Sequence, residues 1–134
     1  MQINNIPDIR RVILIADDKQ SSRDLLRATL DDQYLVVEAS DGEEAIAMAF
    51  ESGPHLVILD IHMPKRDGFG VVKVLRSDPA LQDVPIMALT ASASLDENDR
   101  IMNAGFDACF VKPIGPAKLR EAVAALLQNK ASVA

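Results

Sequence analysis

The chain has 134 residues, of which 49% are hydrophobic and 25% are charged, and its formal net charge is −6. This length is typical of one soluble domain with a substantial core, and the acidic balance argues against nonspecific nucleic-acid binding, which needs a basic surface. The single cysteine cannot form an internal disulfide, and neither a secretory signal nor a membrane-spanning apolar run is visible, so we expect a cytoplasmic protein without membrane insertion.

Short apolar runs alternate along the chain with segments of helical periodicity. The apolar runs predict five strands, over residues 11–16, 34–38, 56–59, 84–89 and 108–111. Five helices are predicted, of which the first, third and fifth span residues 22–30, about 71–78, and 116 to about 127. The second runs from a capping-box pattern at 40–43 to a stop at 53–54, and the fourth runs from a second capping box at 94–97 to a stop at 105. We therefore expect one domain over 11–128, with polar tails at 1–10 and 129–134.

The strand–helix alternation predicts an α/β fold. Parallel strands need helical crossovers, and these helices cover both faces of the sheet, which gives a three-layer αβα sandwich around a five-stranded parallel sheet. If the strand order is 2-1-3-4-5, the order reverses between the first and third strands. Ligands in such sheets bind at the carboxyl ends of the strands, near this reversal.

Polar side chains stand where four of the five predicted strands end. They are Asp17 and Asp18, Asp60, Thr90 and Lys112. Asp60 ends an apolar run, where an unpartnered carboxylate is costly, so partners are expected. Three neighbouring carboxylates repel one another, which favours a hard divalent cation with oxygen ligands, Mg²⁺ in particular. A carboxylate beside such an ion can act as the nucleophile in phosphoryl transfer, with the lysine and the hydroxyl contacting the phosphoryl oxygens.

Each of these residues also has a structural interpretation when it is taken alone. Asp17-Asp18 could cap the first helix, because Asp is a favoured N-cap residue. Thr90 could be a β-branched strand end, and Lys112 could be a surface lysine. The combination at the ends of neighbouring strands favours the metal and phosphate site.

Four fragments, in order and one strand–helix unit apart, together resemble the receiver domain of two-component response regulators. They are Ile15-Ala16-Asp17-Asp18, Leu59-Asp60-Ile61-His62-Met63-Pro64 with Asp67-Gly68, Leu89-Thr90-Ala91, and Val111-Lys112-Pro113. The resemblance covers nearly the whole chain. It implies a flavodoxin-like fold and a stand-alone receiver, unless the chain is a fragment of a larger multidomain regulator.

The resemblance also implies a role for each site residue. Asp60 would be the phospho-acceptor, Thr90 the switch hydroxyl and Lys112 the phosphate-pairing lysine, with a cis peptide bond between Lys112 and Pro113. Four groups would hold Mg²⁺, namely Asp17, Asp18, Asp60 and the backbone carbonyl of His62.

One position departs from the family pattern. Receivers commonly carry an aromatic residue three positions before the lysine, and here that residue is Cys109. The nearby aromatic is Phe110, which should point to the opposite face of the sheet because strand side chains alternate. The aromatic half of the usual switch is therefore in question, and signalling could run through loop and helix shifts.

The sequence thus predicts a phosphorylation-dependent switch rather than a turnover enzyme. Its expected partners are a sensor histidine kinase or phosphotransferase, and a target protein at the face of the fourth helix, fifth strand and fifth helix; it would be a monomer or a phosphorylation-dependent dimer without direct nucleic-acid contact. One alternative is a haloacid-dehalogenase-like phosphatase, although such enzymes place an acid two residues after the nucleophile, where His62 stands. Another is a flavin- or nucleotide-binding module, although the acidic 16–19 segment repels phosphate.

Overall fold

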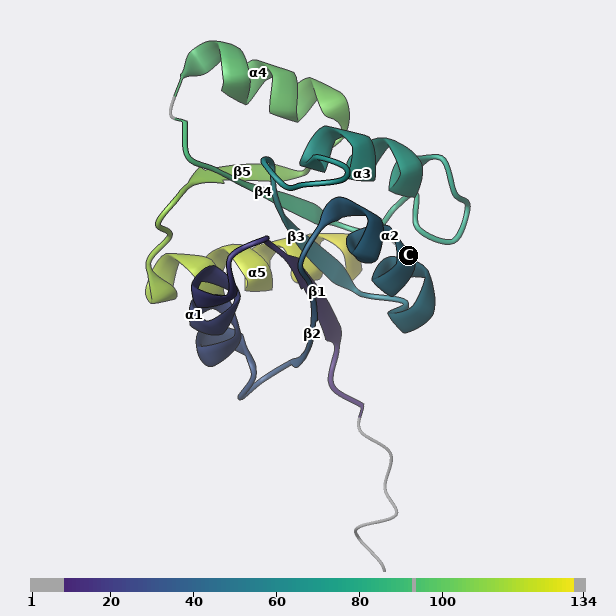
Figure 1. Cartoon of the computed structure of the whole chain (residues 1–134). Coiled ribbons are helices and arrows are strands. Elements are labelled where there is room, and N and C mark those ends of the chain that lie inside the picture. The colour runs from purple at the N-terminus through teal and green to yellow at the C-terminus, as the bar shows by residue number, and fades with distance from the viewer. Residues whose placement is uncertain (1–8, 93, 132–134) are drawn as a thin grey trace, which may run out of the picture.

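A computed structural model describes residues 9–92 and 94–131, in which strands and helices alternate from end to end (Figure 1). The strands are β1 (Val12–Ala16), β2 (Leu35–Ala39), β3 (Leu56–Asp60), β4 (Ile86–Thr90) and β5 (Ala108–Val111). The helices are α1 (Gln20–Leu30), α2 (Gly42–Ser52), α3 (Gly68–Arg76), α4 (Leu95–Ala104) and α5 (Pro116–Ala131). Among these described helices, none is long and apolar enough to cross a membrane.

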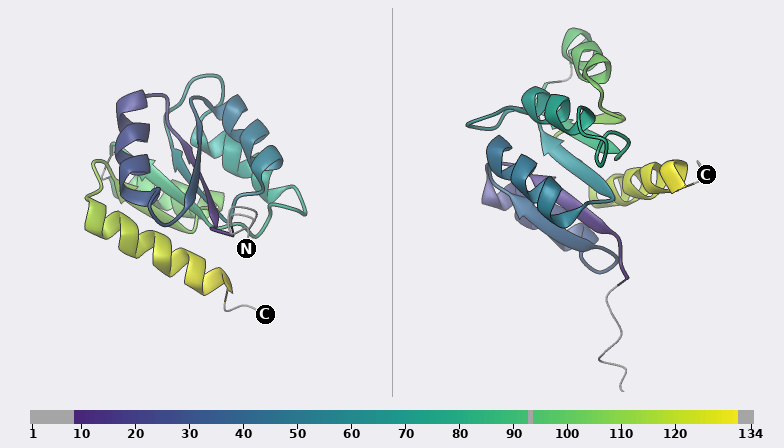
Figure 2. Two further views of the ribbon diagram at one scale, coloured as in Figure 1. Left: turned by 90° about the horizontal axis from the view of Figure 1, so that it is seen from below. Right: turned by 90° about the vertical axis from the view of Figure 1, so that its right-hand side faces the viewer.

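All the strands form one parallel sheet in the order β2-β1-β3-β4-β5. Helices α1 and α5 lie on one face of this sheet and α2 and α3 on the other, as the left view of Figure 2 shows. Helix α4 lies beyond α3 at the β5 edge (Figure 1). The predicted αβα sandwich and strand order are therefore confirmed.

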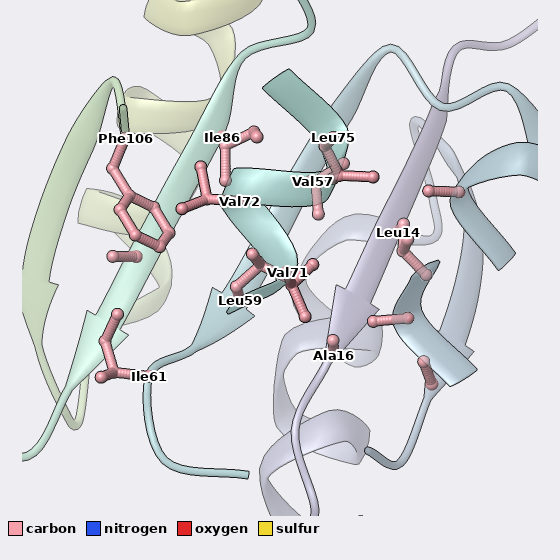
Figure 3. Packing of buried hydrophobic residues seen from close by; sticks show 14 of the residues in the cluster. Leu14, Ala16, Val57, Leu59, Ile61, Val71, Val72, Leu75, Ile86 and Phe106 are labelled. Carbon is pink, nitrogen blue, oxygen red and sulfur yellow. The ribbon is translucent and has the colours of Figure 1, made fainter. Parts of the chain in front are cut away.

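The sheet separates two hydrophobic cores because successive strand residues point to opposite faces. The core between the sheet and α2, α3 and α4 contains Leu14, Leu59, Val71 and Leu75, among others (Figure 3). Ile101 of α4 belongs to the same core. The core between the sheet and α1 and α5 contains Ile13, Ile58, Leu26, Leu119 and Val123, among others. Strand β3 is buried along its whole length, so its terminal carboxylate lies at the boundary of the interior.

Of the two predicted capping boxes, the one at α4 is confirmed and the one at α2 is shifted by one residue. The pattern predicts Ser40 as the N-cap, but the N-cap is Asp41, whose carboxylate accepts the backbone N–H of Glu44 at 2.8 Å. Ser and Asp are both favoured N-caps, so composition alone does not choose between neighbours. At α4 the predicted N-cap Ser94 is confirmed, because its hydroxyl accepts the backbone N–H of Glu97 at 3.2 Å.

The C-terminal end of the described chain differs from the expectation. Helix α5 continues past residue 128 to Ala131, into the range expected to be a tail, while residues 1–8 and 132–134 of the two expected tails lie outside the described residues. In α1, Leu26 and Leu30 face the core, whereas Leu25 is exposed because it lies off the core-facing side of the helix.

An arginine at the end of α3 links four segments at the amino ends of β4 and β5. The guanidinium of Arg76 donates to the backbone carbonyls of Gln82, Val84 and Gly105, at 2.6–3.0 Å, and to the carboxylate of Asp107 at 2.8 Å. The same carboxylate oxygen of Asp107 accepts the first backbone N–H of β4. This network lies at the amino ends of the strands, opposite the carboxyl ends where the predicted site lies.

Candidate functional site

The sheet register brings the predicted site residues to one edge. Ala16 of β1 pairs with Leu59 of β3, so the residues that follow them, Asp17 and Asp60, are neighbours. Asp60 in turn pairs with Leu89, one residue before Thr90. Parallel strands end at the same edge, which is why side chains from distant parts of the sequence meet there.

The three predicted carboxylates form one cluster. Asp17, Asp18 and Asp60 each offer an oxygen, and these oxygens all lie within 4.8 Å of one another. Asp17 and Asp60 are only 1% and 7% exposed, whereas Asp18 is exposed to solvent. The backbone N–H of Lys19 donates to Asp17 at 2.9 Å, and that of His62 donates to Asp60 at 3.2 Å. Backbone bonds therefore orient the two buried carboxylates.

Lys112 reaches this cluster from the end of β5. Its ammonium nitrogen lies 2.7 Å from Asp17 Oδ2 and 3.4 Å from Asp60 Oδ2. The backbone N–H of Lys112 donates to the carbonyl of Thr90 at 2.8 Å, and the peptide bond to Pro113 is cis, as predicted. A single lysine thus faces two buried carboxylates.

The charges in this cluster alter one another's protonation. Burial raises the pKa of Asp60 above its ordinary value of 3.8, and the charge of Asp17 raises it further, against the opposing effect of Lys112. Burial works against the charge of Lys112, but its bond to Asp17 and the charges of Asp60 and Asp17 raise its pKa above 10.5. Lys112 is therefore charged near neutral pH, and the carboxylates outnumber it.

This donor set fits a hard divalent cation. The candidate ligands among the described residues are carboxylate oxygens converging on one point, with one acid exposed so that coordinated waters can be kept. Mg²⁺ prefers oxygen ligands and usually retains several waters. The predicted ligand role of the His62 backbone carbonyl stays a prediction.

Thr90 is buried at the end of β4, and its hydroxyl has a partner that the sequence did not indicate. It donates to Glu97 Oε1 at 2.9 Å, and it accepts the backbone N–H of Ser92 at 3.1 Å. The same Glu97 oxygen lies 3.7 Å from the imidazole Nε2 of His62. In the sequence, the capping-box pattern already explains a glutamate at position 97, so no sequence signal pointed to its contact with Thr90.

Cys109 and Phe110 point to opposite faces of the sheet, as predicted. Cys109 packs against the core beneath α3 and α4, whereas Phe110 packs against the core beneath α1 and α5. Burial, and then the charge of Glu97, raise the pKa of the Cys109 thiol. The thiol is therefore protonated near neutral pH, which agrees with a packing role rather than a reactive one.

Comparisons with known proteins identify the same kind of domain. The response regulator receiver domain family matches residues 13–124. The probable transcriptional regulator ycf27 of Guillardia theta is 41% identical over 128 residues, which are 93% of this chain and 49% of that protein. The transcriptional regulatory protein PrrA of Mycobacterium tuberculosis is 38% identical over 92% of this chain and 52% of its own length. The chain thus spans about half the length of these curated relatives.

Solved structures agree in fold over nearly the whole chain. The chemotaxis protein CheY4 of Vibrio cholerae superposes with a TM-score of 0.83 at 31% identity, covering 87% of this chain and 98% of that chain. A CheY-like receiver domain protein from Methanospirillum hungatei gives 0.86 at 25% identity, covering 93% and 99%.

Proposed function

We propose, since the chain belongs to the response regulator receiver domain family, that it is a signalling switch whose phospho-acceptor is Asp60. Membership of this family supports phosphorylation-dependent two-component signalling. The observation that carries the proposal is the placement of Asp60: a nearly buried carboxylate at a strand end, with two further acids within 4.8 Å and a lysine ammonium 3.4 Å away. A structural carboxylate would be balanced by its neighbours, whereas this cluster has an excess of negative charge.

The proposed reaction moves one phosphoryl group from a phosphohistidine of the kinase or phosphotransferase. A carboxylate oxygen of Asp60 attacks the phosphorus, so that a P–O bond forms as the P–N bond breaks and the donor imidazole departs with its electron pair. The product is an aspartyl phosphate. Positioning and charge stabilisation account for most of the catalysis in such a transfer.

Lys112, Thr90 and the acidic cluster would support the transferred group. Lys112 already lies between Asp17 and Asp60, so its ammonium can pair with phosphoryl oxygens without a large movement. The hydroxyl of Thr90, at the neighbouring strand end, would donate to one of those oxygens. The acidic cluster would hold Mg²⁺, which supplies positive charge to offset that of the phosphoryl group.

We further propose that the chain is not a turnover enzyme. A phosphatase of the haloacid-dehalogenase type uses an acid two residues after its nucleophile, and His62 stands there with an imidazole that is 70% exposed. We therefore expect the protein not to hydrolyse p-nitrophenyl phosphate faster than buffer alone. Sustained turnover that depends on Asp60 would support the phosphatase instead.

The proposed output is a change of protein contacts at the face formed by α4, β5 and α5. The relatives ycf27 and PrrA are named transcriptional regulators and are about twice as long as this chain. If this chain is part of a longer product, we propose that the remainder supplies a DNA-binding output; if it acts alone, the face itself binds a target protein. Immunoblotting of the native product for its mass separates these two cases.

Loss of phosphorylation in Asp60→Asn tests the proposed acceptor. The wild type should acquire an acid-stable, hydroxylamine-labile label from radiolabelled acetyl phosphate in the presence of Mg²⁺, and Asp60→Asn should acquire none. The matched control is Asp67→Asn, at the N-cap of α3, where Asn is also a favoured cap and the label should persist. Unchanged labelling of Asp60→Asn would exclude Asp60 as the acceptor.

A further inference from the structure

The Thr90 hydroxyl is already engaged by a carboxylate from α4. Its oxygen lies 2.9 Å from Glu97 Oε1, and it also accepts the backbone N–H of Ser92 at 3.1 Å. A hydroxyl carries a single proton, so it can donate one hydrogen bond at a time. Since the carboxylate can only accept, the proton of this bond comes from Thr90. In this state the hydroxyl therefore donates toward α4.

Glu97 belongs to the first turn of α4, so this hydrogen bond ties the helix to the end of β4. Ser94, the N-cap, accepts the backbone N–H of Glu97, and the Glu97 side chain is 19% exposed. A capping box would return the glutamate carboxylate to the N-cap backbone, but here the carboxylate lies against Thr90 instead. Glu97 thus links the first turn of the helix to the site.

We propose, on the basis of the function proposed above, that Glu97 is a positioning residue. It directs the Thr90 hydroxyl toward α4, and it competes with the phosphoryl group for the one hydrogen bond that this hydroxyl can donate. Phosphorylation of Asp60 then draws the hydroxyl to a phosphoryl oxygen. The bond to Glu97 breaks, and the first turn of α4 loses its tie to β4. Glu97 in this way carries the change from the site to the output helix.

The small side chain at Cys109 is consistent with this arrangement. Cys109 is paired with Ala88 in the sheet and packs on the α3 and α4 side, the face to which Thr90 also belongs by strand alternation. Glu97 lies close enough to Cys109 for its charge to act on the thiol. Position 109 holds no aromatic residue that could couple Thr90 to the output face. Glu97 provides this coupling instead.

Removal of the Glu97 carboxylate should favour the activated state. We expect Glu97→Ala to bind beryllofluoride with Mg²⁺ about five- to tenfold more tightly than the wild type, the scale of one net intramolecular hydrogen bond that no longer has to be broken. The chain has no tryptophan, so binding is best followed by NMR titration of the ¹⁵N-labelled protein. Glu97→Gln keeps a hydrogen-bond acceptor, so its increase in beryllofluoride affinity should be less than half of the increase in Glu97→Ala.

A double-mutant cycle separates this role from simple charge repulsion. In a Thr90→Val background no hydroxyl competes, so adding Glu97→Ala should change the beryllofluoride affinity by less than about twofold. Asp96→Ala, which removes an exposed acid from the same turn of α4, is the matched control and should also have a small effect. Without beryllofluoride, amide shifts at residues 95–98 should move in Glu97→Ala toward their activated positions.

Each result decides between the two proposals. An equal gain from Glu97→Ala in the presence and absence of the Thr90 hydroxyl, or unchanged affinity in Glu97→Ala, would overturn the positioning role while leaving the phospho-acceptor intact. Failure of the wild type to bind beryllofluoride and to accept a phosphoryl group would instead overturn the function proposed for Asp60, and the role of Glu97 with it.

Discussion

Two partly buried charge clusters lie at opposite ends of the strands of the same sheet, and they differ in how their charges are balanced. At the amino edge, every nitrogen of the Arg76 guanidinium donates a hydrogen bond, to three backbone carbonyls and to Asp107. At the carboxyl ends of the strands, three carboxylates cluster beside one lysine that contacts two of them, Asp17 and Asp60, and burial raises the pKa of Asp60. The first cluster is balanced in charge and hydrogen bonds, whereas the second has too many acids.

Charge balance therefore separates a structural cluster from a binding cluster. A satisfied network stabilises the fold because every buried polar group already has its partner. A cluster with excess negative charge costs stability until a cation or a proton arrives, so it retains affinity for a ligand. Substitution of Arg76, addition of Mg²⁺ and substitution of Asp60 test this contrast through the free energy of unfolding.

Arg76→Ala should destabilise the fold by about 3 kcal/mol, because it removes the cation that pairs with the Asp107 carboxylate and the donor that the carbonyls of Val84 and Gly105 share. Urea unfolding monitored by circular dichroism measures this change. Arg66→Ala is the control: Arg66 is 41% exposed in an ion pair with Glu43, and its loss should cost less than about 1 kcal/mol. Equal costs for the two variants would contradict the structural role of the Arg76 network.

Mg²⁺ should stabilise the wild type by about 1.4 kcal/mol at ten times its dissociation constant, as expected of the proposed ion that would bind only the folded acidic cluster. Asp17→Asn should lose most of this gain, which urea unfolding with Mg²⁺ and with EDTA detects. Asp24→Asn, which changes an exposed acid on α1, should keep it. A gain of equal size in all three proteins would mean that the ion binds elsewhere.

Asp60→Asn should raise the free energy of unfolding by about 1 kcal/mol at pH 7 in EDTA, because it removes a desolvated charge. The pKa of Asp60 is raised in the folded protein, so the stability that its protonation provides is complete below 3.8 and is lost as the pH rises through the folded pKa. The advantage of the variant should therefore grow with rising pH and disappear toward pH 3.8. A variant less stable than the wild type at pH 7 would contradict this interpretation.

The sequence predicted the parts of the molecule that follow from periodicity and from strand ends. Asp60 and Thr90 were predictable because each ends an apolar run, and parallel strands bring such ends together. Glu97 was not, because the capping box already explains a glutamate three residues after Ser94. Arg76 was not either, since its partners belong to loops whose positions only tertiary packing determines. Long-range polar contacts of this kind leave no periodic signal.

The unequal attachment of α4 determines how this helix can move. Its C-terminal end is held where Arg76 donates twice to the carbonyl of Gly105, whereas its N-terminal end is held through the bond between Glu97 and Thr90. If only the second attachment is released, we expect the helix to rotate about Gly105 rather than to shift along its axis. Ten residues span roughly 15 Å, so a rotation of about 10° would displace the far end by roughly 2.6 Å. Leu95, which is 80% exposed, stands at that far end and would travel the greatest distance.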